Sequence, residues 1–410
     1  MRRVKFKYRG ISFLLRLHNY LRYYFVRNRE ISIKNVLVGQ QSGFPLEIWL
    51  KITGENSRLS KLIIDFPYVS FLKKIEEDET RLNDLGFMIK TDYFKMGNLC
   101  IRFAGHFMGA KDNSSLLKWM QEYYSFYKRI KNGEERYIKF LSKKGHSKIK
   151  EYPILSKIKN SNFYEVIDGH HRIAIMYLRG EKYINAIILG KKYSALQKML
   201  LNINQINAIE LYQPVEVNEV NLWPVVRNCK DRFSLMVNFL KKLEIKKGTL
   251  IDMACSYGWF TANFKKRGFK VIGIDRDPQA IKIAQLIYKL KSQETLSEKI
   301  ESFIDRNKIK YDVVLFLSIL HHYGLGKEKG DVNDILKKLD RITGKVLFLD
   351  SGENHEEWFK KKLPEWDINY IIKKIRENTS FKKIVKLGKD SDNVGRYSKN
   401  YGRTLLACVR

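Results

Sequence analysis

The stretch of residues 249–280 limits what this chain can fold into more than any other part of the sequence. An apolar run ends at Asp252, a loop of mostly small residues follows, and residues 260–267 can form a helix. A second apolar run, residues 270–274, ends at Asp275. Strand, tight loop, helix and strand in this order predict a βαβ unit with an acid after its second strand, an arrangement typical of ribose-binding sites. The alternative is an ordinary βαβ unit with a solvated acid at a strand end.

The loop after Asp252 separates two classes of nucleotide-containing cofactor. A dinucleotide site needs three glycines spaced GxGxxG, so that a pyrophosphate can sit on the helix N-terminus. Here the loop reads Asp-Met-Ala-Cys-Ser-Tyr-Gly, and Gly258 is its one glycine. The pattern therefore does not favour a dinucleotide.

The loop instead resembles motif I of the class I S-adenosylmethionine (SAM) methyltransferases, an acid-x-Gly-x-Gly-x-Gly pattern. Asp252 and Gly258 match, whereas Ala254 and Ser256 stand where the family has glycines. Both replacements are small, so the backbone can still approach the methionine part of SAM closely. The resemblance implies SAM as the cofactor and Asp275 as its ribose-binding acid. A degenerate pocket that binds no SAM is the alternative.

A second motif lies at residues 311–322, YDVVLFLSILHH. This buried strand and turn resemble motif IV of the same family, a D-x-V-apolar run ending near a histidine. The resemblance implies that residues from Ser318 to His322 face the transferable methyl group, with Ser318 in contact with the cofactor.

Four side chains are candidates for catalysis on loops at the carboxyl edge of the predicted sheet. They are His321 and His322 after one strand, and Glu353 and His355 after the next. A hydroxyl acceptor benefits from a general base, which histidine or glutamate can supply. The alternative for each histidine is a hydrogen-bonded structural role.

The order of the predicted elements extends the resemblance to residues 225–410. A strand is predicted at 344–352, a helix at 366–377, and two last strands that read as an antiparallel hairpin. We therefore expect an α/β fold, a mostly parallel Rossmann-like sheet that ends in this hairpin. No third strand stands out between residues 291 and 310, where Asp305 is put forward as the contact to adenine.

A glycine-containing turn, Asp-Gly-His-His-Arg, lies upstream at residues 168–172. A strand is predicted before it, at 163–167, and a helix after it, at 173–178. The helix N-terminus exposes free N–H groups, and histidine with arginine adds positive charge. The turn therefore predicts a cradle for phosphate or carboxylate.

This stretch resembles the core of the ParB/sulfiredoxin-like fold, whose Gly-x-His/Arg-Arg turn contacts nucleotide phosphate. Gly169, His171 and Arg172 match, and His170 stands where sulfiredoxin has its reactive cysteine. Sulfiredoxin chemistry is therefore not expected, and ligand binding or a structural role is favoured over catalysis. No third ligand accompanies the histidines, so no metal site is predicted.

We divide the chain into four segments. Residues 1–130 form a basic, aromatic α+β region, with residues 31–66 rich in strands. Residues 131–201 form the ParB-like module, and residues 202–224, interrupted by two prolines, form a connector to the domain at 225–410.

The formal charge of +33 over 410 residues implies an acidic partner: nucleic acid, an anionic membrane or an acidic glycan. Residues 1–29 alternate cations with aromatic residues and fit either a helix on an anionic membrane or a helix packed on the core. Arginines interrupt their apolar residues, so no membrane span is predicted. Four dispersed cysteines suggest a reducing cytosol, and we expect the protein there or at the inner face of the membrane.

Three hypotheses remain for function. A ParB-like module joined to a methyltransferase domain resembles proteins of bacterial surface-polysaccharide clusters, which favours methylation of a sugar or phosphosugar of a cell-surface glycan. The charge favours an RNA (tRNA) methyltransferase, although no base-methylation motif and no RNA-binding signature is present. The third is a non-catalytic binding protein whose SAM pocket has degenerated. The oligomeric state stays open.

Overall fold

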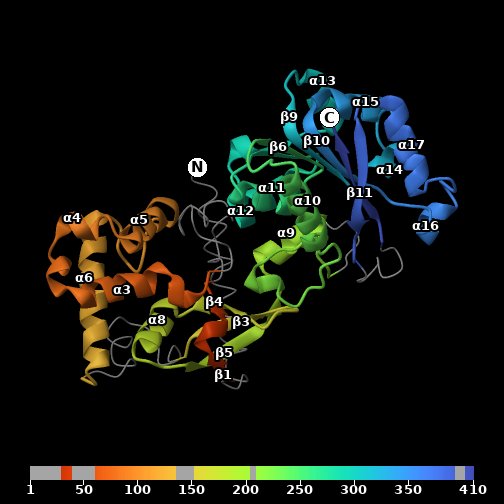
Figure 1. The fold of residues 1–410 in the computed structure, drawn as a ribbon. Coiled ribbons are helices and arrows are strands. Elements are labelled where there is room, and N and C mark those ends of the chain that lie inside the picture. Colours follow the sequence, from red (N-terminus) through yellow and green to blue (C-terminus); the bar gives the residue numbers. More distant parts are fainter. Residues whose placement is uncertain (1–28, 39–60, 135–151, 204–208, 393–401) are drawn as a thin grey trace, which may run out of the picture. The chain divides into compact units, whose positions relative to one another are not determined.

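A computed structural model describes residues 29–38, 61–134, 152–203, 209–392 and 402–410 (Figure 1). The chain consists of two compact units, Met1–Leu196 and Gln197–Arg410. The segment predicted to contact a membrane lies outside the described residues, apart from Arg29. In the described part, none of the helices has the length and apolar character needed to cross a membrane.

Unit 1 contains a five-stranded mixed sheet with the strand order β1-β5-β3-β4-β2. The β3·β5 and β2·β4 pairs are parallel, and the β1·β5 and β3·β4 pairs are antiparallel. The strands are β1 (Arg29–Ser32), β2 (Val36–Leu37), β3 (Ile154–Ile158), β4 (Tyr164–Asp168) and β5 (Tyr183–Lys192).

The helices of unit 1 are α3 (Pro67–Glu77), α4 (Leu85–Met88), α5 (Asp92–Ala104), α6 (Asn113–Lys131) and α8 (His170–Leu178), with short 3-10 turns η1 (Ile33–Asn35), η2 (Ile63–Asp65) and η3 (Glu79–Leu82). Residues 62–66, the end of the region expected to be rich in strands, were expected to form a strand. This was wrong for Ile63–Asp65, which form a 3-10 turn. Phe66 caps α3 and Pro67 begins it, so the chain turns immediately before the helix. α9 (Ala195–Ile203) begins at the end of unit 1 and continues into unit 2.

Unit 2 contains a seven-stranded sheet with the order β11-β12-β10-β9-β6-β7-β8. The five consecutive strands β10, β9, β6, β7 and β8 are parallel to one another. β12 is antiparallel to both of its neighbours, β10 and β11. The strands are β6 (Thr249–Met253), β7 (Lys270–Asp275), β8 (Thr295–Ser297), β9 (Tyr311–Leu317), β10 (Thr343–Asp350), β11 (Lys383–Lys389) and β12 (Thr404–Val409). The predicted α/β class and the terminal hairpin are confirmed.

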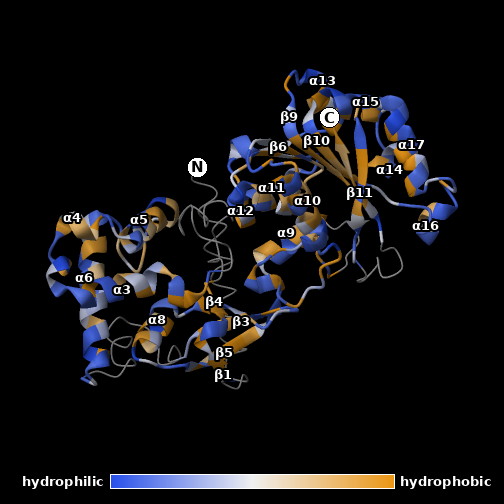
Figure 2. Cartoon of the chain, in the orientation of Figure 1, coloured by the Kyte–Doolittle hydropathy of each residue, from blue (hydrophilic) through white to orange (hydrophobic). Residues whose placement is uncertain are grey.

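Helices cover both faces of this sheet (Figure 1). Val313 and Leu315 of β9 pack in one apolar cluster with α10 and α11, and Val314 and Phe316 pack in another with α13, α15 and α17. A strand buried on both faces is apolar throughout, and the central strands are orange in Figure 2. The helices are α10 (Lys230–Lys242), α11 (Trp259–Lys266), α12 (Pro278–Tyr288), α13 (Ile300–Arg306), α14 (Leu320–Gly324), α15 (Val332–Ile342), α16 (Glu357–Lys360) and α17 (Ile368–Asn378), with 3-10 turns η5 (Asn218–Val220) and η6 (Ser292–Glu294).

The third strand, which the sequence analysis did not find, is β8. It has three residues, of which Thr295 alone is buried, so no apolar run marks it. Asp305, put forward as the adenine contact, does not follow this strand. It is exposed on α13 and pairs with Lys338 at 3.0 Å, whereas Glu298 is the acid that follows β8 directly.

The described part of the predicted connector packs within unit 2. The backbone of Leu211 pairs with Pro224 and Val226. The side chain of Gln213 accepts a hydrogen bond from the backbone N–H of Trp259, the first residue of α11, at 3.4 Å. This segment therefore contacts the start of the helix that follows the motif I loop.

Gly273 in the middle of β7 leaves no room for a side chain. A Cβ there would lie 2.8 Å from Thr261 Oγ1 and 3.0 Å from Cys255 Sγ. We predict that Gly273→Ala lowers the free energy of unfolding by about 1–3 kcal/mol in urea denaturation, the range for overpacking. Ile309→Ala removes an exposed side chain from the same unit and is expected to change it by less than about 0.5 kcal/mol. Equal effects of the two substitutions would contradict the close packing of β7 against α11.

Candidate functional site

The candidate residues of unit 2 gather at the carboxyl ends of four neighbouring parallel strands, β7, β6, β9 and β10. Asp275 ends β7, the motif I loop follows β6, Ser318 follows β9, and Asp350 ends β10. In open α/β sheets, ligands bind at this edge.

The motif I loop has the backbone conformation of a glycine loop without its glycines. Ala254 and Ser256 have φ angles of 58° and 51°, and Gly258 has 78°. This left-handed region costs a residue with a Cβ roughly 1–2 kcal/mol. The two residues that replace family glycines therefore adopt the conformation that glycine favours, and the loop keeps its path.

Asp275 joins the end of β7 to this loop. Its Oδ2 accepts a hydrogen bond from the Ser256 N–H and its Oδ1 accepts one from the Asp277 N–H, both at 2.9 Å. Burial raises the pKa of the Asp275 carboxyl. Each carboxylate oxygen has a second lone pair, so the two ribose hydroxyls of SAM can still donate to this side chain. The donor and acceptor set fits the cofactor.

Asp252, the acid of motif I, is more deeply buried than Asp275, at 2% exposure. Its Oδ2 accepts hydrogen bonds from Thr261 N–H at 3.1 Å and Thr261 Oγ1 at 2.7 Å. Burial raises its pKa to about 7. In the structure, Asp252 therefore joins β6 to α11 and thereby fixes both ends of the loop.

Ser318 follows β9 in the left-handed region, with φ 59°. Its N–H donates to Asp350 Oδ1 at 2.6 Å and its hydroxyl donates to the same oxygen at 2.9 Å. Asp350 thus fixes the turn that resembles motif IV.

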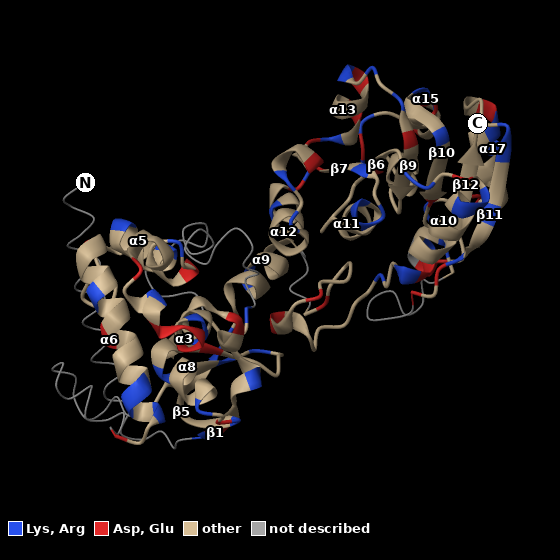
Figure 3. Ribbon diagram, turned by 60° about the vertical axis from the view of Figure 1, so that its left-hand side comes forward, with Lys and Arg blue, Asp and Glu red and all other residues tan. Residues whose placement is uncertain are grey.

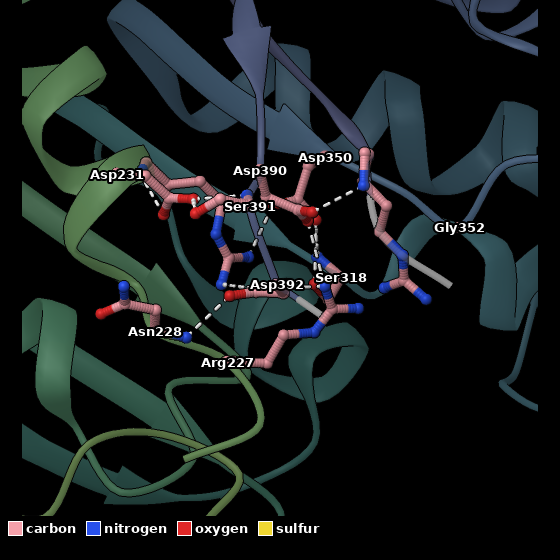
Figure 4. A network of polar contacts seen from close by, with 12 residues as sticks. Arg227, Asn228, Asp231, Ser318, Asp350, Gly352, Asp390, Ser391 and Asp392 are labelled. Carbon is pink, nitrogen blue, oxygen red and sulfur yellow. Dashed lines mark hydrogen bonds and ion pairs between the residues drawn. The ribbon is translucent and has the colours of Figure 1, made fainter. Parts of the chain in front are cut away.

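Asp350 belongs to a buried network of ions, drawn in Figure 4. Arg232 of α10 donates to Asp350 at 2.9 Å and contacts Asp392 at 3.5 Å. Arg227 donates to Asp390 and Asp392, at 3.0 Å each. Burial alone would raise the pKa of Asp350, but the charges of Arg232 and Arg227 hold it below its ordinary value.

None of these five charged residues was proposed from the sequence as part of the site. Arg227 and Arg232 lie before and within a helix, and Asp390 and Asp392 follow a strand near the end of the chain. One signal was available, because Asp350 ends an apolar run directly before Ser351 and Gly352, as Asp275 ends its own strand.

His321 is held in one tautomer. Its Nδ1 accepts a hydrogen bond from the Gly352 N–H at 3.1 Å, and its side chain is buried. A backbone amide only donates, so the ring proton of the neutral histidine is on Nε2. Burial, followed by the charge of Arg403, lowers the pKa of His321 well below its usual range. The nitrogen of His321 that could accept a proton, Nδ1, is therefore already engaged by the Gly352 N–H.

His322 and Glu328 connect the ends of β9 and β7. His322 Nδ1 lies 3.7 Å from Glu328 Oε1, and Arg276, the residue after β7, contacts the two Glu328 oxygens at 3.0 and 3.1 Å. Burial and the charge of Lys327 lower the pKa of His322 to about 4. This histidine is neutral at pH 7.

The loop after β10 is fastened to the start of β12. Glu356 accepts two hydrogen bonds from Arg403, at 2.6 and 2.8 Å, and Glu353 Oε1 accepts one from the Thr404 N–H at 2.5 Å. His355 is exposed, with its Nδ1 3.9 Å from Glu353 Oε2. Of the four catalytic candidates, Glu353 and His355 lie together, and His321 and His322 have ring centroids 4.6 Å apart.

Comparison with known proteins decides the class of unit 2. Residues 228–366 match the family model described as a methyltransferase domain. This part of unit 2 is a methyltransferase domain. No curated protein matches the chain in sequence.

Solved structures similar to the chain include the bifunctional kinase-methyltransferase WbdD, at 18% identity and a TM-score of 0.41, covering 51% of this chain and 46% of that one. The chain thus spans less than half the length of WbdD. The magnesium protoporphyrin IX methyltransferase ChlM of Synechocystis PCC 6803 with bound SAM has 18% identity and a TM-score of 0.32, covering 44% of this chain and 78% of that one. The methyltransferase domain of bacterial CtHen1 has 16% identity and a TM-score of 0.33, with coverage of 44% and 98%.

In unit 1, Gly169 alone separates β4 from α8, so the two histidines and Arg172 begin the helix, three residues earlier than predicted. Gly169 precedes α8 with φ 103°, and Arg172 donates to Asp168 and to the Tyr152 carbonyl, both at 3.0 Å. Burial lowers the pKa of His170 to about 4 and that of His171 to about 3. The histidines are neutral, so they do not supply the positive charge that was expected of a phosphate cradle.

His171 packs among aromatic rings of α3, α5 and α6. Tyr93 accepts a hydrogen bond from Trp119 Nε1 at 2.9 Å, and its own hydroxyl lies 2.6 Å from His171 Nε2. The rings of Tyr68 and Tyr123 lie edge-on to His171, at 4.6 and 4.7 Å between centroids. These contacts give His171 a role in the core. The ParB-like assignment of the module stays a prediction.

Replacing Ala254 by glycine tests the loop of the methyltransferase domain. We predict that Ala254→Gly raises the free energy of unfolding by up to about 1 kcal/mol, because relief of the left-handed conformation exceeds the entropy that glycine adds to the unfolded chain. Ala262→Gly, inside α11, is the matched control and should lower it by about 1 kcal/mol or more. Urea denaturation measures both. A loss of similar size in the two variants would contradict the left-handed loop.

Proposed function

We propose that the chain transfers a methyl group from SAM to an oxygen of a sugar or phosphosugar of a cell-surface glycan. The choice of acceptor rests on the ionisable groups near the turn after β9, because none of them is well suited to act as a general base. His321 already accepts a hydrogen bond at its basic nitrogen, His322 is neutral with a pKa of about 4, and Glu353 accepts from the backbone of β12. A phosphate oxygen is anionic at neutral pH and needs no base, so a phosphosugar suits this site best.

The cofactor would be held by the motif I loop and the end of β7. Asp275 would accept from the ribose hydroxyls, and Ala254, Ser256 and Gly258 would face the methionine part, with Ser318 nearby after β9. Bound SAM supplies an electrophilic methyl group on a sulfonium. Methyl transfer is an in-line displacement, so the chain mainly has to align the acceptor, and alignment can contribute roughly 7–11 kcal/mol.

In this proposal the network of Figure 4 acts by holding the acceptor turn. Asp350 accepts two hydrogen bonds from Ser318 and is itself fixed by Arg232. His322, which is partly exposed, and His355, which is exposed, are the groups proposed to contact the acceptor. The formal charge of +33 suits an acidic substrate.

An RNA acceptor is the second candidate, because the same positive charge suits a polyanion. Figure 3 shows lysine and arginine on helices and strands of both units. The proposed membrane contact of residues 1–29 would favour a lipid-linked or membrane-proximal glycan over RNA. The ParB-like module would then bind a part of the substrate distant from the reacting oxygen.

Calorimetry with SAM tests the role of Asp275. We predict that Asp275→Ala weakens SAM binding at least tenfold, since the two ribose hydroxyls lose their acceptor. Asp305→Ala, which removes an exposed acid on α13, should bind SAM like the unchanged protein. Unchanged SAM affinity of Asp275→Ala would contradict the assignment of the ribose site. Absence of SAM binding by the unchanged protein would contradict the proposal that it is an enzyme.

Transfer of labelled methyl groups identifies the acceptor. Full-length protein is incubated with SAM carrying a radioactive methyl group and with either a bacterial membrane glycolipid fraction or total tRNA. We expect label in the glycolipid fraction, and less label after this fraction has been treated with phosphatase. Label confined to tRNA would show that the acceptor is RNA, and label unaffected by phosphatase would favour a sugar hydroxyl.

A further inference from the structure

Two lysines of unit 1 lie side by side on neighbouring strands. Lys157 of β3 and Lys191 of β5 are direct partners in the register of this parallel pair, so their side chains leave the same face of the sheet. Neighbouring strands are about 4.8 Å apart, and like charges directly opposite each other on a sheet destabilise it. The pair therefore lowers the stability of the fold unless an anion accompanies it.

No carboxylate within the described residues forms an ion pair with either ammonium. Glu165 of the neighbouring strand β4 pairs instead with the next lysine along β5, Lys192, at 2.9 Å. Burial, followed by the charge of Lys191, lowers the pKa of Lys157. Among the described residues, the pair is thus a local excess of positive charge that no carboxylate neutralises.

The Lys157 ammonium is also held in position. Its Nζ lies 4.2 Å from the centroid of the Tyr164 ring, and Tyr164 faces Lys157 across the β3·β4 pair. A cation over an aromatic face is attracted by the ring. Beyond this pair, the next lysine of the hairpin, Lys159, lies over the Tyr193 ring at 4.7 Å. Such a lysine differs from a solvated surface lysine, which has many conformations.

We propose that Lys157 and Lys191 form a binding site for a single phosphate monoester. Two adjacent ammonium groups match a group that carries a charge of −1.5 to −2 at pH 7, whereas a carboxylate or a phosphodiester balances one of them. The site lies at the start of β4, at the opposite end of this strand from Gly169 and α8. It is therefore separate from the Asp-Gly-His-His-Arg turn, and it does not depend on methyl transfer.

The first test is calorimetry of the full-length protein with glucose 6-phosphate at low ionic strength. Lys157→Gln and Lys191→Gln are each expected to weaken binding at least tenfold. Lys90→Gln, an exposed lysine of the same unit, is the matched control and should bind as the unchanged protein does. Equal affinity of all variants, or no binding by the unchanged protein at 10 mM ligand (about the weakest affinity of interest), would overturn the proposal.

Further ligands distinguish the sources of the anion. Inorganic phosphate that binds as well as glucose 6-phosphate, with the same loss in the variants, would support the site with no contribution from the sugar. A short oligothymidylate that loses affinity in both variants, while glucose 6-phosphate does not bind, would overturn it in favour of a polyanion surface.

The second test uses thermal unfolding and is independent of affinity. In phosphate-free buffer, Lys191→Gln should melt at or above the temperature of the unchanged protein, because it relieves the repulsion with Lys157. Added phosphate should raise the melting temperature of the unchanged protein and of Lys90→Gln. It should not raise that of the variant that carries both Lys157→Gln and Lys191→Gln. An equal increase in all three proteins would overturn the proposal.

Discussion

The site of the methyltransferase domain depends on the buried ion pairs that Arg227, before α10, and Arg232, within it, make with aspartates at the end of β10 and directly after β11. Arg227 and Arg232 contact aspartates that lie 118 to 165 positions later in the chain. Charges taken out of water are costly, and the loss of one partner from such a pair costs about 3–5 kcal/mol. The turn after β9 is held by the same Asp350, so an uncompensated charge here would disturb both the domain and its site (Figure 4).

Three aspartates at one edge of the sheet illustrate how position determines chemistry. Asp252 is buried beside a threonine and has a raised pKa, whereas Asp350 is buried beside arginines and has a lowered one. Asp275 accepts backbone N–H groups and keeps lone pairs for a ligand. All three end, or nearly end, apolar strands. The resemblance to the methyltransferase family singled out Asp252 and Asp275, whereas no motif pointed to Asp350.

Local patterns predicted the methyltransferase domain well. Apolar runs located β6, β7, β9 and β10, because the middle residues of these central strands are apolar and mostly buried. The terminal hairpin was located as well. The short edge strand β8 has no such run and was not found. In unit 1, the order of strand, Gly169 and helix was predicted correctly, but the helix begins three residues earlier than expected, and the charge expected of the histidines was wrong.

The missing information concerned contacts over long distances in sequence. His171 meets Tyr93, which lies 78 positions earlier, and the pKa of this histidine follows from burial that no local pattern reveals. Arg232 and Asp392 likewise give no sign in the sequence that they will meet. The tautomer of His321 depends on one backbone amide, Gly352, on a different strand end. Sequence patterns name the residues of such a site but not their protonation.

The raised pKa of Asp252 couples the folding of the methyltransferase domain to the uptake of a proton at this one carboxyl. This carboxyl ionises near pH 4 in an unfolded chain but near pH 7 in the folded domain. Between these values the folded state carries the extra proton, so the contribution of Asp252 to stability falls as the pH rises through this window. Both hydrogen bonds from Thr261 go to Oδ2, which leaves Oδ1 to carry the proton. The side chain that fixes the motif I loop thus also gains or loses a proton near neutral pH.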